Sequence, residues 1–100
     1  MYDTSNLKNM KKINEAAPAA FEAFMAFDKA AMAEGALPVK TKELIAIAVA
    51  MTTQCPYCID IHSKKAKSAG CTEAEIAESI LVAAALRAGA AVTHGTHAIT

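Results

Sequence analysis

The sequence of 100 residues is long enough for one domain, and 54% of its residues are hydrophobic. Ten Lys and Arg residues balance ten Asp and Glu residues, so the chain lacks the concentrated positive charge of a nucleic-acid-binding protein. We find no apolar run that we expect to span a bilayer and no signal-peptide pattern, which predicts a cytoplasmic protein without a membrane partner.

The residue types favour helix throughout. The chain has 24 alanines, and Leu, Met, Glu and Lys together supply 26 of the other 76 residues. Side chains of these types lose little rotamer freedom in a helix. Apolar and polar residues never alternate long enough to indicate a half-buried strand. We therefore predict an all-α fold of about five helices.

The N-terminal part of the chain differs from the rest. Residues 1 to 16 are polar and mixed, so we expect an N-terminal segment ahead of a single helical domain over residues 17 to 100. Pro18 suits the first position of a helix because its missing N–H would have no partner there. The first helix is predicted over about residues 18 to 33, with Gly35 as its C-terminal cap.

Two further helices follow, joined by a short turn into an antiparallel hairpin. The second is predicted over about residues 38 to 53, and the third over about residues 56 to 69. Pro56 begins the third helix and leaves Cys55 at its N-cap. One face of the second helix carries apolar residues at helical spacing: Leu44, Ile47, Ala48 and Met51.

The last helix begins at a clear signal. Gly70 ends the third helix, and Thr72 with Glu75 three residues later forms a capping box. We expect a bend or restart near Gly89 and an end around His97. Its apolar positions continue the helical periodicity: Ile76, Ile80, Leu81 and Ala84.

Two stretches are apolar nearly all round the helix: residues 18 to 33 and residues 79 to 100. A chain of this length buries only a limited fraction of its surface, so we predict a homo-oligomer. Arg87 is the one charge in the second stretch and should have a buried or interfacial carboxylate partner. Glu22 and Glu78 are the candidates.

Cys55, Cys58 and His62 lie three and four residues apart, so they share one face of the third helix. The helix N-terminus stabilises a thiolate, the reactive form of cysteine. One turn further, an imidazole can accept the Cys58 proton or donate to a leaving oxygen.

Glu43 is a carboxylate beside a long apolar run. In a hairpin that turns at residues 53 to 55, it lies roughly 15 Å back along one helix, and His62 lies roughly 10 Å along the other. Glu43, His62 and Cys58 can then form a proton relay, with a water filling any gap. A carboxylate in a first helical turn can also simply favour the helix dipole.

A metal site is the competing interpretation, because a close cysteine pair in a reducing compartment indicates either redox chemistry or metal. The cysteine pair and His62 supply three zinc ligands, but no second close ligand pair is present. A thioredoxin fold needs a strand before the motif, where the pattern predicts a helix. The candidate fourth zinc ligands are Cys71, His94 and His97.

The spacing of Glu43, Cys55, Cys58 and His62, within "KELIAIAVAMTTQCPYCIDIH", resembles the signature of the AhpD-like alkylhydroperoxidases of the carboxymuconolactone decarboxylase superfamily. The resemblance covers about residues 20 to 98, and the chain is similar to a short, single-repeat member. The decarboxylase branch lacks the cysteine pair, so lactone decarboxylation fits poorly.

The resemblance implies an AhpD-like helical bundle that assembles as a homotrimer or homohexamer and acts as a cofactor-free peroxidase or disulfide reductase. Cys58 would attack the hydroperoxide and become a sulfenic acid, Cys55 would close the disulfide, and His62 and Glu43 would relay protons. A thioredoxin-like or lipoyl protein would be the dithiol reductant. The alternative is a non-catalytic helical oligomer whose cysteine pair binds zinc or senses redox state.

Overall fold

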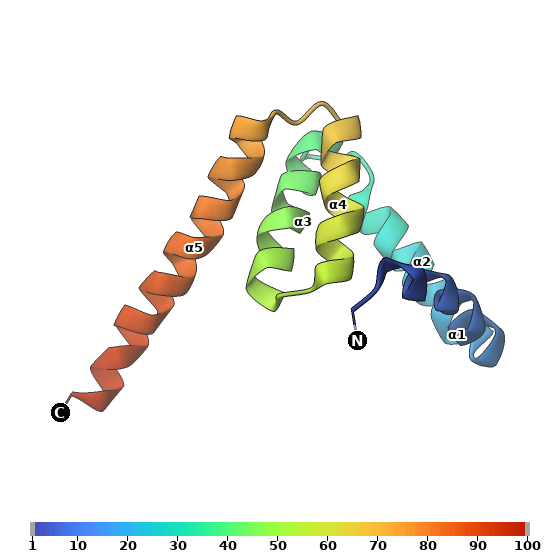
Figure 1. The fold of residues 1–100 in the computed structure, drawn as a ribbon, viewed down its shortest axis with the longest axis horizontal. Helices are drawn as coiled ribbons and strands as arrows, with labels where there is room; N and C mark the ends of the chain where they lie inside the picture. The colour runs from blue at the N-terminus through green and yellow to red at the C-terminus, as the bar shows by residue number, and fades with distance from the viewer. Residues whose placement is uncertain (1, 100) are drawn as a thin grey trace.

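The computed structural model describes residues 2–99 and contains helices and no strand in that range (Figure 1). The all-α prediction is confirmed. Five α-helices and two short 3₁₀ helices follow one another: η1 (Thr4–Asn9), α1 (Met10–Ala16), α2 (Pro18–Met32), α3 (Val39–Thr53), α4 (Pro56–Ser68), α5 (Glu73–Gly95) and η2 (Thr96–Ala98).

The boundaries of α2, α3 and α4 agree with the predicted ranges to within one residue. Pro18 and Pro56 each occupy a first helical position, and Gly70 follows α4 with a φ of 88°, which a side chain would resist. The predicted cap at Gly35 is wrong. The residue that caps α2 is Ala33, in an extended conformation, and the Lys42 side chain instead donates to carbonyls at this helix end.

The capping box of α5 is confirmed: the Thr72 hydroxyl accepts the Glu75 N–H at 3.1 Å, and the Glu75 carboxylate accepts the Thr72 N–H at 2.8 Å. The predicted bend at Gly89 is wrong, because α5 continues to Gly95. A helical glycine costs only about 1 kcal/mol relative to alanine, which the alanine-rich neighbours tolerate. η2 then extends the turn beyond His97.

The N-terminal segment holds structure that the sequence pattern did not indicate. Asp3 caps η1 by accepting the Ser5 N–H at 2.9 Å, and α1 then packs against α2. A seven-residue helix is too short to show a clear apolar periodicity, so its pattern was not recognisable. The division into a segment over residues 1 to 16 and a domain over residues 17 to 100 stays a prediction.

The core lies between the α3–α4 hairpin (residues 39–68) and the first turns of α5. Ile47, Ala66 and Cys71 are buried together, and the predicted α3 face supplies Leu44 and Met51 around them. From α5, Ile76 and Ile80 pack on this cluster as expected, and Ala83 is buried one turn later. Leu81 and Ala84, which continue the same apolar spacing, are exposed.

The molecule is extended rather than compact. Its radius of gyration is 16.6 Å, against about 13 Å for a compact domain of this length. In Figure 1, α5 diverges from one side of the hairpin, and α1 and α2 diverge from the other. Large apolar side chains are therefore exposed on both arms: Phe24, Met25 and Phe27 on α2, and Leu81, Val82, Leu86 and Val92 on α5.

The segment Glu73–Ala98 corrects the expectation that no apolar run is long enough to span a bilayer. By length and composition it is long and apolar enough, with a mean hydropathy of 1.5, and only 6% of the window is buried. The many alanines raise the hydropathy without large side chains. Arg87 lies exposed in this segment, and neither Glu22 nor Glu78 forms an ion pair with it within residues 2–99. A buried partner is therefore ruled out within the single chain, and an interfacial partner stays a prediction.

Candidate active site

The turn between α3 and α4 places the cysteine pair. Gln54 ends α3 in the left-handed conformation, with φ 55° and ψ 44°, and the Cys55 N–H then donates to the Ala50 carbonyl at 3.1 Å. This reversal leaves Cys55 in an extended conformation at the N-cap of α4, as predicted. Its sulfur accepts the Cys58 N–H at 3.3 Å, which is the bond that an N-cap side chain normally makes.

The two thiols of the pair are free and in contact. Cys55 Sγ and Cys58 Sγ lie 2.7 Å apart, within hydrogen-bonding distance, and both residues are half-buried. Because they are one turn apart on the same helix, the sulfurs meet without any movement of the backbone. The pair is therefore placed for oxidation to a disulfide.

The surroundings separate the acidities of the two thiols. The hydrogen bond from Cys58, aided by the Cys58 N–H, lowers the pKa of Cys55. The same sulfur contact, together with burial and the negative charge on Cys55, raises the pKa of Cys58 to about 11. Asp28 on α2 adds a smaller upward push on the pKa of Cys58. The first thiolate of the pair therefore forms on Cys55, with Cys58 holding the shared proton.

Glu43 and His62 meet across the α3–α4 hairpin, as the helical rise predicts. Glu43 Oε2 lies 2.8 Å from His62 Nδ1, and the Glu43 side chain is only 5% exposed. A carboxylate accepts this hydrogen bond, so Nδ1 carries a proton and Nε2 is left for exchange with another group. The contact fixes the orientation of the imidazole and provides its countercharge.

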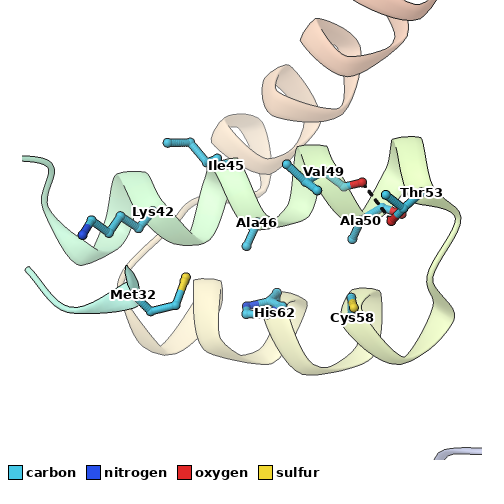
Figure 2. A pocket seen from close by; sticks show the side chains of 9 residues that line it. All are labelled: Met32, Lys42, Ile45, Ala46, Val49, Ala50, Thr53, Cys58 and His62. Carbon is cyan, nitrogen blue, oxygen red and sulfur yellow. Dashed lines mark hydrogen bonds between the residues drawn. The ribbon is translucent and has the colours of Figure 1, made fainter. Parts of the chain in front are cut away.

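Cys58 and His62 line one pocket of about 280 Å³ between α3 and α4, shown in Figure 2. No direct hydrogen bond joins them in the described chain, so a proton passing between them needs a water or a substrate atom. Opposite them on α3 stand Ala46 and Ala50, whose small side chains leave the space open. The remaining lining residues are Met32, Lys42, Ile45, Val49 and Thr53.

Tyr57, between the two cysteines, faces the N-terminal segment. Its hydroxyl accepts a hydrogen bond from Asn6 Nδ2 at 3.2 Å, and its ring packs edge-on against Tyr2 with centroids 4.9 Å apart. The polar N-terminal segment thus lies beside the first turn of α4. The sequence pattern gave no signal of this contact, because it joins residues about fifty positions apart.

The other candidate metal ligands lie elsewhere. Cys71 is buried near the start of α3, where its sulfur lies 3.6 Å from the Lys40 carbonyl oxygen, and burial raises its pKa. His94 and His97 contact each other edge-on, 5.8 Å apart, at the C-terminal end of α5. Across residues 2–99, no three Cys, His, Asp or Glu side chains converge as metal ligands would.

Seven of the nine residues that line the pocket were not recognised as site residues from the sequence: Met32, Lys42, Ile45, Ala46, Val49, Ala50 and Thr53. Lys42 is the neighbour of Glu43, but nothing in the spacing showed that it would contact the end of α2. Met32 is the last residue of α2 and reaches the pocket only because that helix end lies against α3. Such contacts depend on how helices pack, which periodicity does not specify.

Sequence comparisons place the chain among known proteins. Residues 18–100 match the model of the carboxymuconolactone decarboxylase family. The chain is 51% identical over 78 residues to "Uncharacterized protein 4 in cox locus" of Paracoccus denitrificans, covering 78% of this chain and 70% of that protein. It is 32% identical over 87 residues to an uncharacterized protein of Cupriavidus necator, covering 87% and 77%.

Solved structures share the fold. A crystal structure of a protein from Methanobacterium thermoautotrophicum superposes with a TM-score of 0.82 at 35% identity, covering 88% of this chain and 99% of that one. An apo carboxymuconolactone decarboxylase family protein from Legionella pneumophila superposes with a TM-score of 0.78 at 34% identity, covering 82% and 73%. The chain belongs to the carboxymuconolactone decarboxylase family, and so to the superfamily that this family shares with the AhpD-like proteins.

Proposed function

We propose that this protein is a thiol-dependent peroxidase of the AhpD-like type, which reduces organic hydroperoxides through Cys55 and Cys58. The observation that carries the proposal is the convergence on one small apolar pocket of a contacting thiol pair and a histidine held by a buried carboxylate. Together these groups supply a nucleophile, a second thiol and a proton donor, which are the groups that the reaction needs.

Cys58 is the attacking thiol because it lines the pocket, whereas Cys55 does not. Its raised pKa shows that it must first lose its proton, and the adjacent Cys55 thiolate can take this proton along the sulfur–sulfur contact. The Cys58 thiolate then attacks the terminal peroxide oxygen. The O–O bond breaks, Cys58 becomes a sulfenic acid, and the leaving alkoxide takes a proton from His62 to give the alcohol.

Cys55 completes the cycle. Cys55 now carries the proton that it took from Cys58. Its sulfur attacks the Cys58 sulfenic sulfur, the S–O bond breaks, and the departing hydroxide takes the Cys55 thiol proton to leave as water. An external dithiol then reduces the Cys55–Cys58 disulfide and is itself oxidised. In sum, one hydroperoxide and one dithiol give one alcohol, one water and one disulfide. We place this activity in the cytoplasm, where dithiol reductants of the thioredoxin-like or lipoyl type operate.

A second activity, thiol–disulfide exchange, is favoured by the lowered pKa of Cys55. Cys55 sits at the end of the hairpin and is the thiolate that an outside disulfide would meet first. In this reaction Cys55 attacks and Cys58 resolves, which is the reverse of their roles toward peroxide. The same pair can therefore serve both half-reactions, with Cys55 facing the reductant and Cys58 facing the peroxide.

A sulfenic-acid trap separates the roles of the two cysteines. In Cys55→Ser treated with cumene hydroperoxide and dimedone, we expect the adduct on Cys58, while Cys58→Ser should form none and lose peroxide turnover. Cys71→Ala is the control, because Cys71 lies in the core and should not affect turnover. Unchanged turnover in Cys58→Ser would contradict the proposal.

The apolar arms support the further proposal that the protein works as a homo-oligomer, a trimer or a hexamer. Leu86 and Val92 are 69% and 74% exposed in the single chain, on a helix that buries little of itself. Leu86→Glu with Val92→Glu should reduce the particle mass measured by sedimentation to that of one chain. Glu73→Gln is the control on the same helix and should leave the particle mass unchanged. An unchanged mass in the charged variant would contradict assembly through α5.

A further inference from the structure

α2 packs against α1, and its C-terminal end also meets α3. Most of its large side chains are exposed, including Phe24 and Phe27, whereas its last residue Met32 is half-buried against the hairpin. This helix has no side-chain N-cap, and its C-cap residue Ala33 is extended instead of left-handed. Its last carbonyl groups therefore need partners from outside the helix.

Lys42 provides these partners. Its ammonium donates to the Ala31 carbonyl oxygen at 2.8 Å and also to the Ala33 carbonyl oxygen. A cation at this position also complements the negative end of the helix dipole. Lys42 lies in the first turns of α3, one residue before Glu43, so the contact joins the end of α2 to the helix that bears the relay carboxylate.

The clamped helix end forms one wall of the pocket. Figure 2 shows the Met32 side chain beside His62, with its thioether directed toward α3, and Lys42 at the same end of the pocket. Met32 is flexible and apolar, and therefore suited to contact an organic group. Asp28, one turn earlier on α2, is near enough to act on the pKa of Cys58, which also ties this helix to the site.

We propose that Lys42 is a positioning residue: by clamping the last turn of α2, it holds Met32 as the wall that makes the site prefer apolar organic hydroperoxides over hydrogen peroxide. This inference rests on the proposed peroxidase function. A small peroxide gains nothing from an apolar wall, whereas the organic group of a larger one is bound by it. The preference for one peroxide over the other therefore reports on the apolar wall rather than on the step that breaks the O–O bond.

The test compares kcat/KM for cumene hydroperoxide with kcat/KM for hydrogen peroxide. We expect Lys42→Met to lower this ratio by about tenfold, the lower end of what one apolar group is worth in a specificity pocket. Lys40→Met is the matched control: Lys40 is on the same helix but pairs with Glu75 on the surface, and the ratio should stay as in the unchanged protein. An unaltered ratio in Lys42→Met would overturn the inference.

A double variant shows whether Lys42 acts through Met32. Met32→Ala alone should lower the ratio, and Lys42→Met added to it should lower it no further, because the wall is already gone. Additive losses would show that Lys42 acts by another route and would overturn the inference. The loss should also appear in KM for cumene hydroperoxide more than in kcat, since the wall binds the organic group away from the reacting oxygen.

Amide hydrogen exchange tests the clamp without relying on peroxidase activity. In Lys42→Met, the amides of the last turn of α2 and of residues 33 to 37 should exchange faster, whereas Lys40→Met should leave them unchanged. Absence of turnover with either peroxide in the unchanged protein would refute the proposed function and the substrate preference together. Unchanged exchange in Lys42→Met would refute the clamp alone.

Discussion

The α3–α4 hairpin and helix α5 differ in how they use their side chains. The hairpin holds the buried Ile47, the buried Glu43 and the thiol pair, all satisfied by contacts within the hairpin and its neighbours. α5 is longer and equally regular, but beyond its first turns it contacts little and exposes large apolar residues. The proposed chemistry thus resides mainly in one pair of helices, whereas the arms expose apolar surface that the proposed assembly would cover.

The largest expected effect on peroxide turnover comes from neutralising a carboxylate in the hairpin, compared with neutralising one on α5. Glu43→Gln removes the charge that orients and balances His62, so peroxide turnover should fall by about 10²- to 10⁴-fold, the range for lost acid–base catalysis. Glu78→Gln, exposed on α5, should leave kcat/KM unchanged. Equal rates for the two variants would show that no relay through Glu43 operates.

The order of thiol reactivity is the next expected effect. A thiol of pKa about 11 is about a thousandth ionised at pH 8, whereas the lowered pKa of Cys55 makes its thiolate more abundant at any given pH. Initial alkylation by iodoacetamide at pH 8, followed by peptide mass analysis, should therefore modify Cys55 well before Cys58. Raising the pH should speed alkylation of Cys58 more than that of Cys55. Preferential modification of Cys58 would reverse the assigned acidities.

Substitutions in the hairpin and in α5 should also differ in their effect on the free energy of unfolding. Ile47→Ala leaves a cavity at a site with no exposed surface and should cost about 2 to 5 kcal/mol in the free energy of unfolding. Leu86→Ala should cost less, and its cost should grow with protein concentration because it acts through assembly. Urea unfolding at two protein concentrations checks both. A large effect of Leu86→Ala that does not change with concentration would place α5 in the core of the single chain.

The smallest expected effect on the free energy of unfolding concerns the start of α5, which is the part of this helix that packs on the core. Thr72→Ala removes one half of the capping box and should cost about 1 kcal/mol, measured by urea unfolding. Thr93→Ala is the matched control near the C-terminal end of α5. The Thr93 hydroxyl donates only to the Gly89 and Ala90 carbonyl oxygens of its own helix. Its effect should be smaller. If Thr93→Ala cost more, the distal part of α5 would be the better anchored one.

The sequence predicted those parts of the molecule that depend on local chemistry. Proline and glycine placed the helix ends of the hairpin, and the rise of two antiparallel helices predicted that Glu43 and His62 approach each other. The Lys42 contact with α2 and the contact of Tyr57 with Asn6 join segments whose packing no periodicity describes. The order of the two thiol pKa values likewise depends on a sulfur contact, which spacing alone does not set.

The periodicity of α5 did not locate its packed face, for a related reason. Leu81 continues the apolar period but is exposed, because α5 is apolar on several faces and periodicity does not single out the one that packs. Ala83 fills that position instead, because its small side chain allows α5 to approach α3.

The proposed function depends above all on Cys55 and Cys58 forming a peroxide-driven redox couple. Its most direct test is the intact mass of the reduced protein before and after one equivalent of cumene hydroperoxide, with peptide mapping to locate the change. We expect the loss of two hydrogen atoms and a disulfide between Cys55 and Cys58, reversed by a dithiol. An unchanged mass, or oxidation confined to Cys71 or the methionines, would contradict the redox couple.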